Sequence, residues 1–106
     1  MLHYIIVKWK DTVDKQEVSQ KVRKLYAGAV EIPGVYNVIV KEKVTPRPNR
    51  YDLMIVLDMD ENALVAWDNS ELHKKWKAEY GSRIESKCIF AVSYTHLRAH
   101  ETRGNL

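Results

Sequence analysis

The sequence predicts an α+β domain with strands and helices in the order β-α-β-β-α-β. Three observations predict this order. Residues 2–10 are rich in β-branched and aromatic residues. Apolar residues recur at helical spacing over residues 15–30 and 71–80. Proline, glycine and polar residues separate these segments from other short apolar runs. With 106 residues, 45% of them hydrophobic, the chain can form one domain with a single core.

The first predicted strand, residues 2–10, has apolar side chains on both faces. The residues alternate between the faces, with Leu2, Tyr4 and Ile6 on one side and His3, Ile5, Val7 and Trp9 on the other. A strand with two apolar faces is expected at the centre of a sheet, covered on both sides. The second face carries one titratable group, His3, which is therefore a candidate functional residue.

The first predicted helix begins after Asp14, which together with Glu17 resembles a capping box. It ends before Pro33 and Gly34, the strongest break in the chain. Its apolar positions recur at helical spacing: Val18, Val22, Leu25, Tyr26, Ala29 and Val30.

Two strands are predicted next, over residues 35–44 and 51–59, on either side of a proline-containing polar loop. The loop is typical of a hairpin, so these strands are expected to be antiparallel neighbours. Simple alternation divides the earlier strand into two faces: Val35, Asn37, Ile39 and Lys41 on one, and Tyr36, Val38, Val40 and Glu42 on the other.

A short helix is predicted over residues 63–68, and Ser70 is a good N-cap for the next helix. That helix has a broad stripe of Leu72, His73, Trp76, Lys77 and Tyr80, and Gly81 can cap its end. The last predicted strand, residues 84–94, places Ile84, Ser86, Cys88 and Phe90 opposite Glu85, Lys87, Ile89 and Ala91.

The full order is that of a ferredoxin-like fold, with a four-stranded antiparallel sheet and helices on one face. The other sheet face also carries apolar residues, and exposing them costs roughly 25 cal/mol per Å². We therefore expect a homodimer, formed by packing two sheets back to back.

The composition of the chain indicates its cellular compartment. No apolar run is long enough to span a bilayer, and residues 1–20 lack the pattern of a secretory signal. The single cysteine, Cys88, lies in an apolar run, so we predict a buried, unreactive thiol and a cytoplasmic protein.

Residues 92–106 read like a translated sequencing adapter, so we predict a domain over 1–94 followed by a non-native or disordered tail over 95–106. Without the tail the net charge falls from +3 to +2, which gives no electrostatic argument for nucleic-acid binding.

Four motifs resemble the stress-responsive A/B barrel family, whose members are dimeric α+β barrels. They are the segments at 3–11 (His-Tyr-Ile-Ile-Val-Lys-Trp-Lys-Asp), 32–35 (Ile-Pro-Gly-Val), 51–53 (Tyr-Asp-Leu) and 70–76 (Ser-Glu-Leu-His-Lys-Lys-Trp). The last segment departs from the family pattern, because Ser70 and Glu71 stand where many members have histidine and proline.

The resemblance implies candidate catalytic residues. Plant polyketide cyclases of this fold have histidines that match His3 and His73, with a catalytic tyrosine at the position of Trp67. An indole cannot replace a phenol as a proton carrier, so that particular cyclisation is not expected here. His73 remains a candidate general base because histidine titrates near neutrality. A half-buried structural role remains open for His73, and a buried structural role for His3.

Four aromatic residues are candidate ligand-binding residues of a small apolar pocket, with plain core packing as the alternative: Tyr26, Trp67, Trp76 and Tyr80. We expect no cofactor and no metal site. The histidines and glutamate of the tail, His96, His100 and Glu101, imitate a zinc motif but belong to the adapter-like string.

RNA-recognition modules share this order of elements, but they stack bases on exposed aromatic residues of the first and third strands. The predicted third strand has only Tyr51, at its edge, so nucleic-acid binding is not expected. Two hypotheses remain. One is an enzyme that converts a small, partly apolar molecule without a cofactor, and the other is a non-catalytic stress-response or structural binding module. Fold analogy alone does not choose between them.

Overall fold

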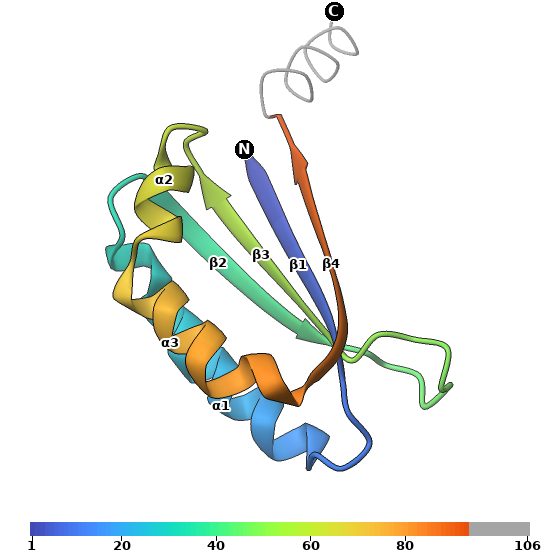
Figure 1. The fold of residues 1–106 in the computed structure, drawn as a ribbon. Helices are drawn as coiled ribbons and strands as arrows, with labels where there is room; N and C mark the ends of the chain where they lie inside the picture. Colours follow the sequence, from blue (N-terminus) through green and yellow to red (C-terminus); the bar gives the residue numbers. More distant parts are fainter. Residues whose placement is uncertain (94–106) are drawn as a thin grey trace, which may run out of the picture.

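A computed structural model describes residues 1–93 and confirms the predicted order of elements (Figure 1). The strands are β1 (Leu2–Trp9), β2 (Val35–Glu42), β3 (Leu53–Met59) and β4 (Ile84–Val92). The α-helices are α1 (Lys15–Ala27), α2 (Ala63–Asp68) and α3 (Glu71–Tyr80), with short 3₁₀ turns over Gly28–Glu31 and Gly81–Arg83. The predicted boundary at residue 94 and the predicted tail 95–106 lie outside the described residues.

The four strands form one antiparallel sheet in the order β2-β3-β1-β4, with the helices on one face (Figure 1). The central position of β1 is the position predicted from its two apolar faces. Ile5 pairs with Ile55 of β3 on one side and with Ile89 of β4 on the other. This ferredoxin-like arrangement confirms the predicted fold class.

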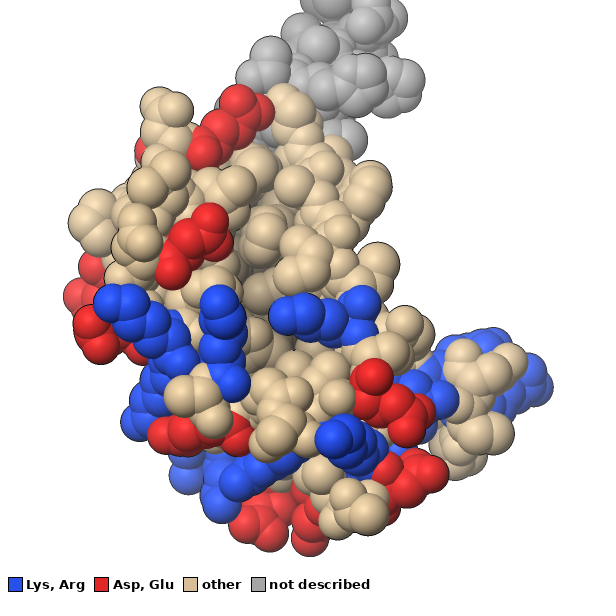
Figure 2. All heavy atoms as spheres, in the orientation of Figure 1, with Lys and Arg blue, Asp and Glu red and all other residues tan. Residues whose placement is uncertain are grey.

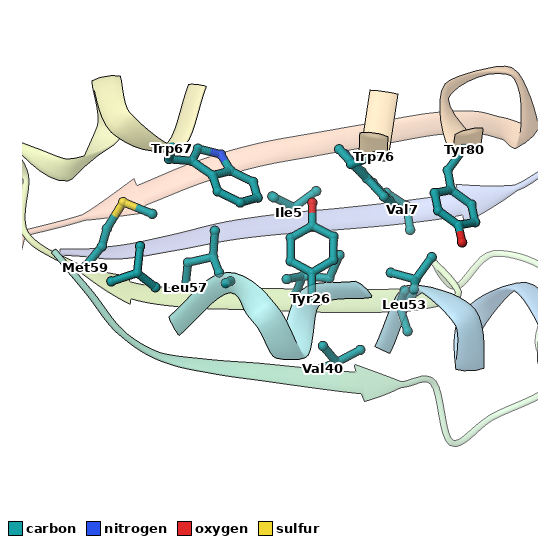
Figure 3. Close-up of a cluster of buried hydrophobic side chains, with 14 of the residues drawn as sticks. Ile5, Val7, Tyr26, Val40, Leu53, Leu57, Met59, Trp67, Trp76 and Tyr80 are labelled. Carbon is teal, nitrogen blue, oxygen red and sulfur yellow. The ribbon is translucent and has the colours of Figure 1, made fainter. Parts of the chain in front are cut away.

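The core lies between the helices and the sheet face that they cover (Figure 3). Every second residue of β1 from His3 to Trp9 is buried on this face. The buried indole of Trp9 donates a hydrogen bond from Nε1 to Ser19 Oγ of α1, at 3.1 Å. This bond satisfies a donor that would otherwise be buried without a partner.

Side-chain caps begin α1 and α3 at the residues that the sequence predicts. Asp14 Oδ1 accepts a hydrogen bond from the backbone N–H of Glu17 at 3.1 Å, and Ser70 Oγ accepts one from the N–H of His73 at the same distance. Each cap satisfies a backbone donor that has no partner within its helix.

Bulges make two of the predicted face assignments wrong. The register of β2 against β3 shifts between Val35 and Asn37, so Val35 shares the helix-covered face with Val38 and Val40. A second shift, opposite Trp9, places Ile84 on the covered face, whereas Ser86 lies on the open one. An extra residue in one strand reverses the side-chain alternation beyond it, which simple alternation does not anticipate.

Cys88 is exposed in the single chain, so the prediction of a thiol buried in the core of the domain is wrong. It lies opposite Ile6 on the sheet face away from the helices, which no part of residues 1–93 covers. The apolar residues of this open face come from all four strands: Leu2, Tyr4, Ile6, Ile39, Met54, Val56, Cys88, Phe90 and Val92.

Gly34 occupies the one position where the described backbone has a positive φ, at 87°. A Cβ atom there would lie 2.7 Å from the Cβ of Ala63, which begins α2. We therefore expect Gly34→Ala to lower the free energy of unfolding by about 2 kcal/mol, through backbone strain and this contact. Urea unfolding followed by circular dichroism measures the change.

Gly81 provides the matched control, because its φ is −55° and a Cβ atom there would meet nothing within 4 Å. Gly81→Ala is expected to be neutral or stabilising by up to about 1 kcal/mol. Equal losses at both glycines would contradict the role given to Gly34.

Candidate functional site

The junction between α2 and α3 places His73. Ser70 Oγ donates a hydrogen bond to the carbonyl oxygen of Trp67 at 2.7 Å and accepts one from the N–H of His73 at 3.1 Å. These two bonds connect the end of α2 to the first turn of α3. The imidazole of His73 then lies beside the indole of Trp67, with ring centroids 5.0 Å apart.

A backbone carbonyl orients the His73 ring. His73 Nδ1 lies 3.1 Å from the carbonyl oxygen of Asp68. Because a carbonyl oxygen only accepts hydrogen bonds, this contact requires a proton on Nδ1. In the neutral ring the Nε2 lone pair is then free to accept a proton, which is the arrangement that a general base requires.

His3 lies on the covered face of β1 and is 7% exposed. Its Nδ1 atom is buried and has no hydrogen-bond partner among the described residues. Burial lowers the pKa of His3 below its usual value; the negative charge of Asp68 opposes this shift and the charge of His73 adds to it. Thus His3, Asp68 and His73 lie close enough for their charges to interact.

The helices do not cover β4 from Lys87 to Ala91, and this leaves the site open on one side. Ile5 is 2% exposed, whereas its β4 neighbour Ile89, on the same sheet face, is 51% exposed. Ala91 of β4 pairs directly with His3. Figure 2 shows a hollow among uncharged atoms in this region, between the α2–α3 segment and β4. A small molecule entering there would meet apolar surface before it reached the histidine.

Three of the four predicted ligand-binding aromatic residues form one cluster. The ring of Tyr26 lies 5.6 Å from that of Trp67 and 5.3 Å from that of Trp76. The Tyr26 hydroxyl is buried without a hydrogen-bond partner among residues 1–93, and burial raises its pKa above the usual value. An unpaired buried hydroxyl costs free energy unless a water or a ligand satisfies it.

Tyr80 lies at the other end of the core from Trp67 (Figure 3). Its ring contacts Trp76 at 5.6 Å and Trp9 at 6.4 Å. The four aromatic residues therefore form one chain of contacts, in which Trp67 lies beside His73 and Tyr80 lies at the far end, beyond Trp76. All four side chains are buried, and their role in ligand binding stays a prediction.

The sequence reasoning missed Asp68. This residue ends α2, its carbonyl oxygen contacts the His73 ring, and its carboxylate acts on the pKa of His3. An acidic residue five positions before a candidate base was the available signal. It is weak, because the carbonyl contact depends on the turn and not on the aspartate side chain.

Within residues 1–93, no three histidine, cysteine or acidic side chains are placed to hold a metal ion together. His96, His100 and Glu101 lie outside the described part of the chain. Among the described helices, none has the length and apolar character needed to cross a membrane.

The lowered pKa of His3 predicts how stability depends on pH. Between the lowered pKa of the folded state and the usual value of 6.5, the unfolded chain binds more protons than the folded one. Stability is therefore expected to fall as the pH drops below about 6.5, until the folded-state pKa is passed. In His3→Gln this component is lost, so thermal unfolding at pH 7.5 and 5.5 should differ less than in the wild type. An unchanged difference would contradict the burial effect.

Known proteins resemble this chain in fold but not detectably in sequence family. No protein-family profile matches the chain, and no curated protein matches it in sequence. It is similar to a dimeric ferredoxin-like protein of unknown function from Thermobifida fusca, at 22% identity over 86% of this chain and 89% of that chain, with a TM-score of 0.73.

Two further solved structures are similar. A hydroxynitrile lyase from Passiflora edulis is 10% identical, with 88% of this chain and 93% of that chain covered and a TM-score of 0.69. A dabb family protein with a ferredoxin-like fold from Mesorhizobium loti is 14% identical. The match covers 87% of this chain and 94% of that chain, with a TM-score of 0.60.

The chain has the ferredoxin-like fold of these proteins. The resemblance predicted from the four motifs is confirmed at the level of the fold. At these identities an A/B barrel fold carries no activity with it, because one fold supports many chemistries.

Proposed function

We propose that the protein is a homodimeric A/B barrel protein that binds a small, partly apolar molecule beside His3 and His73. His73 acts as a general base through Nε2, and His3 provides a second polar contact. The molecule carries an acidic C–H or O–H group that presents its proton to His73. No cofactor takes part in this proposal.

The contact between His73 Nδ1 and the Asp68 carbonyl oxygen carries the proposal. It assigns the ring proton to Nδ1 and leaves Nε2 available as the base. Two further observations support a ligand at this place. His3 Nδ1 and the Tyr26 hydroxyl are buried polar atoms without protein partners among the described residues, and the neighbouring face of β4 is uncovered.

The homodimer in this proposal is supported by the open sheet face and by the similar proteins. The neighbours from Thermobifida fusca and Bacteroides fragilis are described as dimeric ferredoxin-like proteins of unknown function. In this chain the open face has apolar side chains on all four strands. A second copy would bury them without covering the helices on the opposite face.

His73→Asn tests the role of the base. The asparagine amide can still donate to the Asp68 carbonyl oxygen, but nothing replaces the Nε2 lone pair. We expect turnover of a substrate found by metabolite screening to fall by about 100-fold or more, with the midpoint of thermal unfolding changed little. The backbone N–H of His73 keeps its bond to Ser70 in this variant.

His73→Gln is the matched comparison, since its amide reaches toward the Nε2 position but is not basic. Retained turnover in both variants would remove His73 as the base. The binding proposal fails as well if no ligand in the screen raises the melting midpoint of the wild type.

A non-catalytic binding module is the second candidate, and the packing of the aromatic cluster favours it. Tyr26, Trp67 and Trp76 are almost fully buried and contact one another, as core residues do. In this case a ligand that stabilises the protein would be recovered unchanged after incubation. Mass spectrometry of the recovered ligand separates the two candidates.

A further inference from the structure

A groove with a basic rim runs between α1 and α3, apart from the histidine site. Its volume is about 460 Å³. Leu25, Gly28 and Tyr80 form its floor, and charged side chains from both helices line its sides: Lys21, Lys24, Lys75 and Glu79. The floor is recessed at two of its three residues, because Tyr80 is buried and Leu25 is half-buried, whereas Gly28 and the charged side chains are exposed.

The two helices concentrate the positive charge of the protein. α1 carries four basic residues and one acidic residue, and α3 carries three basic and two acidic. Together they have a formal net charge of +4, while the whole chain has +3. Figure 2 shows the Lys and Arg side chains of this view over its lower half, where α1 and α3 lie in Figure 1, with Asp and Glu side chains among them.

We propose that this groove binds an acidic amphipathic helix of a partner protein. The apolar ridge of such a helix lies on Leu25, Gly28 and Tyr80, and its acidic flanks face Lys21, Lys24 and Lys75. This is the helix-in-groove mode of recognition, in which apolar contacts supply affinity and charges supply orientation and association rate. Lys21 also pairs with Glu17 at 3.0 Å and Lys75 with Glu79 at 3.8 Å, and the acidic flanks would compete with these exposed pairs.

The shape of the groove favours a helix over an anionic membrane. A membrane surface is recognised by apolar side chains that project beyond the basic ones and enter the lipid. Here the order is reversed, because the apolar floor lies below the lysines. A narrow ridge of side chains can reach this floor, whereas a flat surface meets only the lysines.

The groove also stays accessible in the proposed dimer. It lies on the helical layer, and the open apolar face lies on the other side of the sheet. Docking of a helix and pairing of two sheets therefore do not compete for the same surface.

Gly28 provides a variant that blocks the groove without disturbing the fold. Its φ is −79°, an ordinary helical value, and a Cβ atom there would meet only Leu72 Cδ1, at 4.0 Å. A glutamate at this position would fill the floor and repel acidic flanks. Gly81→Glu is the matched control, since Gly81 is also helical, has open space around its Cβ position and lies outside the groove lining.

The probe is a fluorescein-labelled helical peptide of about 18 residues, with leucine at i, i+3 and i+4 spacing and glutamate on both flanks. Fluorescence anisotropy with the full chain should show saturable binding that weakens with added salt. Gly28→Glu is expected to reduce the affinity at least about tenfold, as is Lys24→Glu combined with Lys75→Glu. Gly81→Glu should change it less than about twofold.

Four results would overturn the proposal. The first is absence of saturable binding of the acidic peptide. The second is an equal effect of the two glycine variants. The third is equal binding of the same peptide with lysine in place of glutamate. The fourth concerns vesicles made of equal parts of phosphatidylcholine and phosphatidylserine: the protein binds them more strongly than the peptide, and Lys24→Glu combined with Lys75→Glu weakens both kinds of binding equally.

Discussion

Replacement of Asp52 by alanine is expected to lower the free energy of unfolding by about 3–5 kcal/mol, the largest effect we predict for a single side chain. The carboxylate is only 4% exposed and lies just before β3, where it reaches the end of β1. Asp52 Oδ2 accepts a hydrogen bond from the backbone N–H of Trp9 at 2.8 Å. Alanine would leave that buried donor without a partner.

Two lysines surround the same carboxylate. Lys43 Nζ lies 3.1 Å from Oδ1 and Lys15 Nζ lies 3.7 Å from Oδ2, so both lysines form ion pairs with it. Asp52 thus connects β1, α1 and the base of the β2–β3 hairpin. Alanine removes the side-chain contacts to all three and leaves the two ammonium groups without their shared counter-ion.

Asp11→Ala is the matched control for Asp52→Ala. Asp11 also pairs with Lys15, at 3.6 Å, but its side chain is 93% exposed. Such a surface pair contributes at most about 1 kcal/mol. Urea unfolding should separate the two variants clearly. A loss at Asp52 no larger than the loss at Asp11 would contradict the role of burial.

Phe90→Glu is expected to convert the proposed dimer into monomers, with the dimer Kd raised about 100-fold or more. Phe90 lies opposite Tyr4 on the open sheet face and is 61% exposed in the single chain. The substitution therefore costs the fold of one chain little, but it would place a carboxylate between two apolar sheets. Light scattering at micromolar concentration measures the change in mass.

Val65→Glu is the control for Phe90→Glu. Val65 is 67% exposed, so it is as accessible as Phe90, but it lies on α2 in the helical layer. This variant should keep the mass of the wild type. A monomeric wild type would contradict the dimer, and loss of the dimer in both variants would place the interface elsewhere.

The sequence indicated the two histidines of the candidate site, but not the contacts that hold their side chains in position. His3 stood out as the titratable group on an apolar strand, and His73 as a histidine on an amphipathic helix. The contact of His73 with the Asp68 carbonyl oxygen depends on the backbone path between α2 and α3. Such a contact cannot be predicted from the residue type, because every residue has a backbone carbonyl group.

Asp52 was missed for a related reason. In the sequence it is one acidic residue near the start of a strand, next to a polar loop. Its importance comes from Trp9 and Lys15, which are distant in sequence and reach it only after the hairpin has paired with β1. A buried carboxylate is recognisable only when its partners are known.

The sequence by itself determined the order of the elements, the caps at Asp14 and Ser70 and the central place of β1. These features depend on side-chain periodicity and on contacts within a few residues. The tertiary structure decided which residues share a face beyond the bulges at Val35 and Ile84, and that Ile89 stays uncovered. It also brought His73 close enough to His3 for its charge to lower the pKa of His3, because strand pairing and helix packing join residues that are distant in the chain.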